Sequence, residues 1–380
     1  MSHPAPIPFN RPSLVGKEYD YIAETLREMH LSGDGGFTRK CQALLEETLG
    51  CGRALLTTSC TDALELAALL LELQPGDEVI VPSFTFVSTA NAFVLHGAKP
   101  VFIDSRPDTL NLDETQLESL ITDRTRAVVA VHYAGIGCEM ERLQAICDAH
   151  GLTLIEDNAH GLFGLWRGRP LGTFGQIATL SFHETKNFIC GEGGAILLND
   201  RELIERAEIL REKGTNRKQF YRGQVDKYTW VDVGSSFLPA DLLAAFLLAQ
   251  LEERETVLEK RGAVWERYHR NLQEWAKAND VRLPTVVEGA TNPYHMFYLL
   301  MPDNEQRDGM IRHLAFHDIG SVFHYVPLNL SKMGRQFGGF EGQCPVCESS
   351  SDRLLRLPFF NDLSEEEVDR ISDTVKTFQA

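Results

Sequence analysis

Between residues 54 and 200, short runs of apolar and β-branched residues alternate with longer amphipathic stretches. The runs predict seven strands, at residues 54–58, 79–82, 101–104, 127–132, 152–156, 178–182 and 194–199. Helices are predicted between them at residues 62–72, 85–96, 113–120 and 139–150. This alternation is typical of a mostly parallel sheet with helices on both faces, and strands that are apolar throughout are typical of such buried sheets. The sequence therefore predicts an α/β fold.

Beyond residue 200 the pattern changes. Long, charge-laced stretches predict helices at 201–213 and 240–277, and the apolar segments at 292–301 and 322–327 indicate a smaller α+β domain. We expect a large domain at residues 1–250 and a small C-terminal domain at 251–380, with the boundary inside the helix near residues 250–260.

The segment at residues 215–230 is polar and aromatic, with several Arg, Lys and Gln residues. It is long for a loop within a compact domain, and such loops are often functional. Its four large aromatic side chains would expose apolar surface on a monomer, which monomers limit. We therefore expect this segment to pack on a second subunit. The alternative is that it folds back over the pocket of its own subunit.

Composition and charge exclude several classes of protein. The 380 residues carry a formal net charge of −17, which disfavours binding to the phosphate backbone of nucleic acids. No apolar run approaches the ~18 residues of a membrane span, and the first residues lack the pattern of a signal peptide. Eight scattered cysteines then indicate reduced thiols and a cytoplasmic protein. Cys344 and Cys347 form a lone CxxC pair, so we expect no metal site.

Candidate chemistry lies where the predicted strands end, because ligands of open α/β sheets bind at the carboxyl ends of the strands. Ser59, Cys60 and Thr61 lead from the first strand into a helix, whose free N–H groups suit a phosphate. Asp157 follows a buried strand and could pair with a protonated ring nitrogen. Lys186 follows another, where partial burial would lower its pKa and make it a nucleophile toward carbonyls.

Each of these signals has an ordinary explanation when it is taken alone. Ser59 could be a simple helix N-cap, Asp157 a turn residue and Lys186 a surface lysine. Together, a phosphate cup, an acid for a pyridinium and a lysine for a carbonyl are the parts of a pyridoxal 5'-phosphate site. Phe86, at another strand end, could stack on the cofactor ring.

The chain resembles, from end to end, the DegT/DnrJ/EryC1/StrS family of aminotransferases that act on nucleotide-linked keto-sugars. The matching stretches are residues 35–38, 59–64, 81–86, 156–160 and 181–186. Longer literal matches, at 181–187, 212–217 and 222–230, resemble the members that aminate dTDP-4-keto-6-deoxyglucose. The resemblance implies the type I fold of PLP-dependent transferases and a homodimer with shared active sites.

The resemblance also implies roles for single residues. The family's Schiff-base lysine falls on Lys186 and the partner of the pyridinium on Asp157. The other expected cofactor contacts are Ser59, Cys60, Thr61, Phe86, His160, Ser181 and, from the partner subunit, Ser236. The expected substrate contacts are Arg217, Arg222, Lys227, Tyr228, His324, Tyr325 and Asn329.

Three positions depart from the family pattern. Cys60 replaces the glycine of a Ser-Gly-Thr cup, which leaves the backbone N–H unchanged. Leu238 stands where the family often has an arginine, and a leucine cannot bind the carboxylate of the amino donor. Asn329 replaces a histidine near the expected sugar site.

The function implied by the resemblance is transfer of an amino group from glutamate to dTDP-4-keto-6-deoxyglucose, giving dTDP-4-amino-4,6-dideoxygalactose for a cell-surface polysaccharide. Three alternatives stay open at this point: a UDP-linked or 3-keto sugar as substrate, a dehydratase on the same fold, and a non-catalytic regulator. Lys186 argues against the dehydratase, which has histidine there, and the retained Lys186, Asp157 and phosphate cup argue against the regulator.

Overall fold

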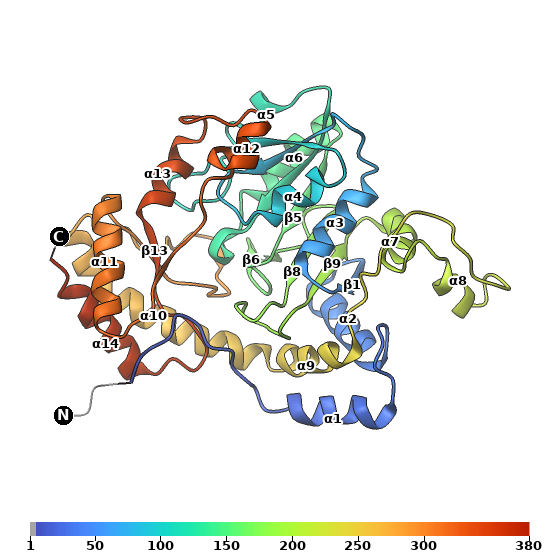
Figure 1. Cartoon of the computed structure of the whole chain (residues 1–380), viewed down its shortest axis with the longest axis horizontal. Coiled ribbons are helices and arrows are strands. Elements are labelled where there is room, and N and C mark those ends of the chain that lie inside the picture. The colour runs from blue at the N-terminus through green and yellow to red at the C-terminus, as the bar shows by residue number, and fades with distance from the viewer. Residues whose placement is uncertain (1–4, 380) are drawn as a thin grey trace.

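A central sheet of seven strands organises the computed structural model, which describes residues 5–379 (Figure 1). In spatial order the strands are β1 (Arg53–Thr57), β9 (Gly194–Leu198), β8 (Ile177–Ser181), β5 (Thr153–Asp157), β4 (Thr125–Val131), β2 (Glu78–Pro82) and β3 (Lys99–Ile103). Only β9 runs antiparallel to its neighbours. All seven predicted strands are therefore confirmed, each within two or three residues at either end.

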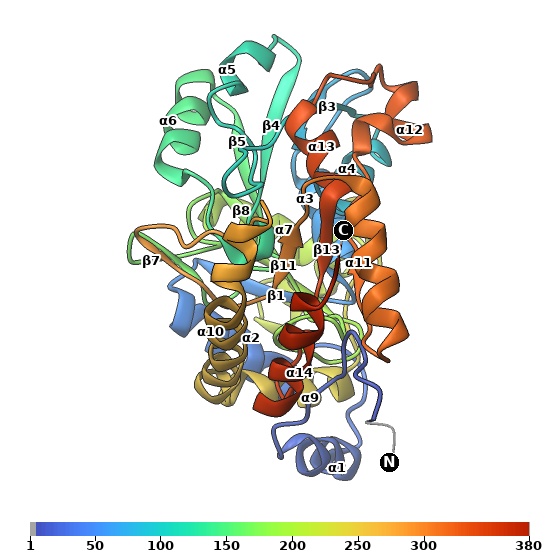
Figure 2. The ribbon, with the colours of Figure 1, turned by 90° about the vertical axis from the view of Figure 1, so that its left-hand side faces the viewer.

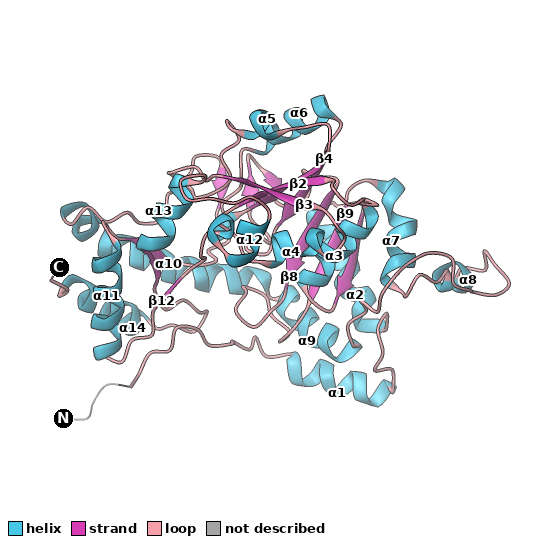
Figure 3. Cartoon of the chain, turned by 45° about the horizontal axis from the view of Figure 1, so that its top comes forward, coloured by secondary structure: helices cyan, strands magenta, loops and turns pink. Residues whose placement is uncertain are grey.

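Helices cover both faces of this sheet, as Figure 3 shows. One face packs against α2 (Gly36–Leu49), α9 (Asp241–Glu252) and α6 (Met140–His150). The other face packs against α3 (Cys60–Leu70), α4 (Ser88–Val94) and α7 (Ile204–Arg211). The strands bury both faces because successive side chains along a strand point in opposite directions.

The C-terminal part of the chain builds a second core around a small antiparallel sheet of β11 (Tyr298–Leu300), β13 (Leu354–Arg356) and β12 (Val322–Phe323). Figure 2, which faces this part, shows three helices around the sheet: α10 (Arg254–Ala278), α11 (Asn304–Phe316) and α14 (Glu365–Lys376). The first residues join it, since Ile7 pairs with Ile319. The boundary that we placed near residues 250–260 stays a proposal.

Differences from the predicted elements have local causes. The helix expected at 240–277 is two helices, because Glu253 leaves helical geometry (φ −96°, ψ 24°) between α9 and α10. The two halves have different partners, α9 packing on α1 (Glu18–Glu28) and α2 and α10 on α14. The loop expected at 215–230 contains a single short helix, α8 (Arg217–Tyr221). The helix expected at 113–120 shrinks to α5 (Leu117–Leu120), since the Asp113 side chain binds Thr115 in a turn.

The remaining elements are short. They are β6 (Leu165–Trp166), β7 (Arg169–Pro170), β10 (Ala290–Thr291), α12 (Lys332–Gln336), α13 (Pro345–Arg353) and three single 3₁₀ turns. Within residues 5–379, no helix combines the length and the apolar character that crossing a bilayer requires.

Candidate active site

The carboxyl ends of β1, β4, β5 and β8 open into a cavity of about 780 Å³, whose opposite wall comes from the small sheet. The cavity brings together most of the side chains that the sequence singled out. Those that line it are Ser59, Cys60, Thr61, Phe86, Asp157, His160, Ser181, Lys186, His324 and Tyr325. Residues far apart in the chain thus meet at one edge of the sheet, as the parallel strand order requires.

Lys186 lies in the turn that follows β8, where its backbone N–H donates to the carbonyl of His183 (2.9 Å). Burial disfavours the charged amine and lowers the pKa of Lys186 to about 8, while the nearby Asp157 and Cys60 oppose the change. At pH 7 about one tenth of the amine is therefore uncharged and nucleophilic, compared with well under one thousandth for a lysine of ordinary pKa.

Asp157 is the last residue of β5, and its carboxylate faces the same cavity. The Thr89 hydroxyl donates to it (2.7 Å), as does the backbone N–H of Ala159 (3.3 Å). Burial raises the pKa of Asp157, and these two hydrogen bonds together with Lys186 counteract the rise. The buried Asp157 carboxylate can therefore accept a hydrogen bond from a cationic partner in the cavity.

The N-terminus of α3 forms another part of the cavity wall. The Ser59 side chain accepts from the N–H of Asp62 (3.0 Å) and caps the helix. The N–H groups of Cys60 and Thr61 make no hydrogen bond within residues 5–379, so the first turn keeps two donors for an anion. The turn lies directly on β9, since a Cβ on Gly194 would sit 2.4 Å from the Cys60 nitrogen.

Aromatic side chains form a third wall. His160 stacks on His295, with ring centroids 4.1 Å apart, and its Nε2 lies 3.3 Å from the Tyr325 hydroxyl. Burial lowers the pKa of both histidines well below the usual value, so both rings are neutral at pH 7. The Nδ1 atom of His160 is buried without a partner among the described residues. Phe86 remains 56% exposed at the mouth of the cavity.

These groups fit pyridoxal phosphate. Free helical N–H groups suit its phosphate, a buried carboxylate suits its ring nitrogen, and a lysine of lowered pKa suits its aldehyde. The stacked rings of His160 and His295 provide a surface for the flat face of the cofactor ring, and the unpartnered His160 Nδ1 provides a polar atom beside it.

The other predicted site residues do not line this cavity. Asn329 is fully buried, and its side chain bonds with Ser83 (2.6 Å), Glu348 (2.8 Å) and the carbonyl of Phe340 (3.0 Å). The structure thus gives Asn329 an anchoring role between β2 and the C-terminal part, and its expected contact with substrate stays a prediction.

Residues 215–230 form an arm that, with α8, projects from the body of the molecule (Figure 1). Arg217 pairs with Glu212 (2.9 Å) and Arg222 with Glu208 (2.7 Å), while Lys227 and Tyr228 are exposed, as is Ser236 beyond the arm. The arm therefore does not fold back over the pocket of its own subunit, and its contacts with substrate or cofactor stay predictions.

The sequence reasoning missed some residues that the cavity uses. One of them is Thr89, in the first turn of α4 and three residues after Phe86, whose hydroxyl positions Asp157. His295 and Arg356 come from the C-terminal part, and no local pattern connects them with the strand ends.

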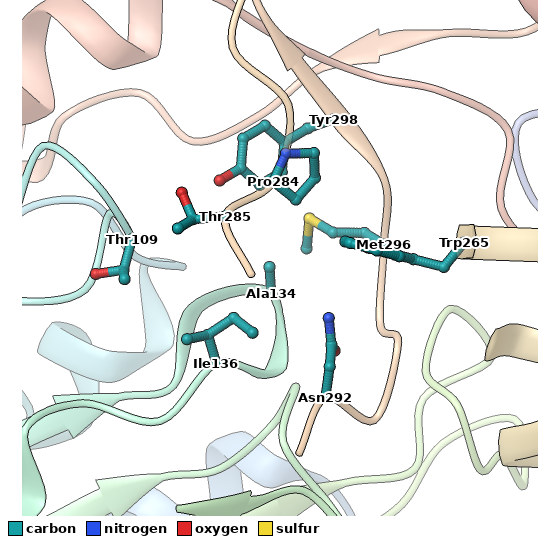
Figure 4. A pocket seen from close by; sticks show the side chains of 9 residues that line it. All are labelled: Thr109, Ala134, Ile136, Trp265, Pro284, Thr285, Asn292, Met296 and Tyr298. Atoms are coloured by element: carbon teal, nitrogen blue, oxygen red, sulfur yellow. The ribbon is translucent and has the colours of Figure 1, made fainter. Parts of the chain in front are cut away.

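A second cavity is far smaller, about 10 Å³, which is room for about one water molecule. Figure 4 shows the nine side chains around it: Thr109, Ala134, Ile136, Trp265, Pro284, Thr285, Asn292, Met296 and Tyr298. Met296 also lines the large cavity, so the two spaces share this side chain in their walls. The small cavity has no charged group and is not a candidate for chemistry.

The family model described as the DegT/DnrJ/EryC1/StrS aminotransferase family matches residues 12–376. The chain belongs to this family. It is 31% identical to the spore coat polysaccharide biosynthesis protein SpsC of Bacillus subtilis over 97% of this chain and 96% of the relative. It is 30% identical to GDP-perosamine synthase of Escherichia coli O157:H7, with 98% of each covered. The solved PMP form of the sugar aminotransferase Spr1654 from Streptococcus pneumoniae superposes with a TM-score of 0.91, at 28% identity and 98% coverage of each chain.

Membership of this aminotransferase family confirms the fold class that we predicted. The expected cofactor is confirmed at the level of the family, because Spr1654 has been solved in both PLP and PMP forms. The narrower resemblance to enzymes that aminate dTDP-4-keto-6-deoxyglucose is not supported by these relatives, one of which is named for a GDP-linked sugar.

Proposed function

We propose that this chain is a PLP-dependent aminotransferase that carries an amino group from glutamate to a nucleotide-linked keto-sugar. The proposed acceptor is dTDP-4-keto-6-deoxyglucose and the proposed product dTDP-4-amino-4,6-dideoxygalactose, for a cell-surface polysaccharide. The observation that carries the aminotransferase proposal is that Lys186, Asp157 and the start of α3 meet around one cavity. The choice of sugar rests on the literal matches at residues 212–217 and 222–230.

Bound pyridoxal phosphate would supply an electron sink for the carbanion that forms at the carbon bearing the amino group. Asp157 would hold the ring nitrogen in its protonated form, with Thr89 fixing the orientation of the carboxylate. The N-terminus of α3, with the hydroxyls of Ser59, Thr61 and Ser181, would hold the phosphate.

Lys186 has two proposed tasks. Its amine would hold the cofactor through the cofactor's aldehyde, and it would also be the group that takes a proton from the substrate carbon and returns one. A pKa of about 8 suits both tasks, because neither protonation state is then strongly favoured near neutral pH. The same residue acts in the reverse direction on the keto-sugar.

The proposed assembly is a homodimer in which the arm at residues 215–230 reaches the partner's cavity. Tyr221, Tyr228 and Trp230 are 67%, 51% and 77% exposed in the single chain, as expected for side chains that a second subunit covers. In that arrangement Arg217, Arg222 and Lys227 would face the diphosphate of the substrate, and Ser236 the phosphate of the cofactor.

The direct test is incubation of the purified protein with glutamate and dTDP-4-keto-6-deoxyglucose, followed by mass spectrometry and NMR of the product. The proposal predicts a 4-amino sugar with the galacto configuration and 2-oxoglutarate. Amination only of a UDP-linked or 3-keto sugar would move the assignment to that substrate. A colourless protein that binds no pyridoxal phosphate would instead favour the non-catalytic alternative.

A further inference from the structure

Arg356 is the last residue of β13, the middle strand of the small sheet, and it lines the large cavity. In the two-sided pairing of β13 it lies opposite Tyr298 and Val322, and Val322 lines the same cavity. The strand therefore directs the Arg356 side chain toward the space that Lys186 faces from the other side.

The Arg356 side chain is partly buried. Its guanidinium makes no ion pair and no hydrogen bond within residues 5–379, and its Nε is shielded from solvent without a partner. Two arginines that are more deeply buried are fully engaged: Arg211 pairs with Asp34 (2.9 Å), and Arg261 donates to Asn361 (2.8 Å) and to two backbone carbonyls. Burial without compensation lowers the pKa of Arg356 and costs free energy. An unpaired guanidinium in a cavity wall has its natural partner in an anion from outside the chain.

The neighbours of Arg356 hold it in place without neutralising it. The guanidinium carbon lies 4.8 Å from the centroid of the Phe9 ring, which supports one face of the group. Tyr133 and Tyr325 are close enough to interact electrostatically, and burial keeps both phenols protonated by raising their pKa. The rigid fork is thus preorganised and still free to donate.

Among the residues that the structure describes, one other lysine or arginine lines the cavity. It is Lys186, which the proposed function commits to the cofactor and to proton transfer. Leu238, where related chains often have an arginine, lies against Gly33 and offers no charge. An amino acid that enters the cavity nevertheless brings a carboxylate that must leave water. The phosphate of the cofactor already has the N-terminus of α3.

We infer that Arg356 binds the α-carboxylate of the amino donor, through two parallel N–H···O hydrogen bonds from its guanidinium fork. This inference rests on the proposed aminotransferase function and adds the residue that positions the donor. A bidentate guanidinium–carboxylate pair also fixes the rotation of the donor about its Cα, so that the hydrogen to be removed can face Lys186.

The test follows the first half of the reaction alone, as the change in visible absorbance when amino acids convert the PLP-loaded protein. Arg356→Met is expected to raise the KM for glutamate about ten- to hundredfold, because it removes a charge-assisted pair. Arg356→Lys should give a KM between those of wild type and Arg356→Met, because lysine keeps the positive charge but cannot form the paired hydrogen bonds of a guanidinium. Arg312→Met, at an exposed arginine of α11, is the matched control and should change nothing.

Two amides of glutamate show which of its two carboxylates Arg356 binds. Glutamine keeps the α-carboxylate, whereas isoglutamine has a carboxamide in its place. Wild-type protein should prefer glutamine strongly, and Arg356→Met should lose most of that preference. If Arg356→Met leaves the KM for glutamate unchanged and weakens dTDP binding instead, the residue belongs to the diphosphate and the inference is wrong.

A calorimetric titration with glutarate, which cannot react, separates this inference from the proposed function. Glutarate binding that Arg356→Met abolishes would support the carboxylate site even if the protein aminates no sugar. Equal binding to both proteins would overturn the site even if transamination occurs. Thermal unfolding of Arg356→Met checks the fold, and this variant should be at least as stable as wild type, because an unpaired and partly buried charge is gone.

Discussion

Lys186 and Asp157 respond in opposite directions to the same burial. Taking both side chains out of water disfavours the charged form of each, which lowers the pKa of the amine and raises the pKa of the carboxyl. Without a cofactor this arrangement is unfavourable, since each group is held where its usual charge is poorly solvated. The cost is recovered only when a ligand arrives with a carbonyl for one and a cation for the other.

Lys186 should therefore capture pyridoxal phosphate with an unusual pH dependence. Because only the uncharged amine reacts, the capture rate of cofactor-free protein should rise about tenfold per pH unit below pH 8 and level off above it. An exposed lysine would keep rising toward its ordinary pKa of 10.5. Stopped-flow absorbance across pH 6–10 measures the profile, and a midpoint near 10 would contradict the assigned burial.

Lys186→Ala should reduce turnover about 100- to 10,000-fold, because it removes the general acid and base, and should leave the fold intact. Steady-state assays with circular dichroism test both statements. Transamination at a near wild-type rate would remove Lys186 from its proposed role.

Asp157→Asn should retain cofactor but lose about 10- to 1000-fold in activity, since a neutral side chain no longer favours the protonated ring. Thr89→Val, which removes only the hydrogen bond to Asp157, should lower the activity roughly tenfold.

For thermal stability, the effect of Asp157→Asn should have the opposite sign. The folded pKa of Asp157 is raised, so its ionised form destabilises the cofactor-free protein above that pKa, and Asp157→Asn should unfold at a higher temperature at pH 7. A lower melting temperature for Asp157→Asn would contradict this.

At the scale of the element, β5 ends in two carboxylates with different tasks. Successive residues point to opposite faces, so Asp157 faces the cavity while Glu156 faces the side of the sheet that α2, α6 and α9 cover. Glu156 accepts from the backbone N–H groups of Gly172 (2.7 Å), Phe174 (2.6 Å) and Gly175 (2.7 Å), and from the His132 ring (2.9 Å). One carboxylate thereby secures the loop after β7, and the strand end that carries Asp157 is held in place.

Glu156→Gln should lower the free energy of unfolding by about 2–4 kcal/mol, since an amide NH₂ cannot accept from these buried donors. Glu288→Gln, at an exposed position, is the control and should stay within about 0.5 kcal/mol. Chemical denaturation of the two variants gives the comparison, and equal stabilities would mean that the loop has other anchors.

The elements and the site could be predicted to different depths. Continuous apolar runs identify the seven strands. Asp157 ends one of them and Lys186 lies five residues after another, so local sequence was sufficient for both. The break at Glu253 was not visible, because α9 and α10 differ in their packing partners and not in their propensity. Arg356 was missed for a related reason: its lack of a partner is a property of the three-dimensional surroundings.

At the scale of the whole molecule, the projecting arm is the feature that a single chain does not explain. Its exposed rings argue for a partner subunit, and mixing two inactive variants tests that idea. Lys186→Ala is combined with a chain carrying Arg222→Ala and Ser236→Ala. With shared sites and random exchange, the mixture should recover about one quarter of wild-type activity, because half of the dimers have one intact site. No recovery, with subunit exchange confirmed, would contradict shared sites, and neither variant alone should gain activity.

The cavity wall joins the two ends of the polypeptide. Phe9 and Phe359 both line it, and the N–H of Phe359 donates to the carbonyl of Phe9 (3.1 Å). During translation, at about 5–20 residues per second, the phosphate cup and Lys186 leave the ribosome many seconds before β13 does. For that period the nascent chain has an exposed reactive amine and lacks the part of the cavity wall that β13 and the residues after it provide. Stable cofactor retention becomes a marker of completed synthesis, and chains halted before β13 are expected to emerge colourless.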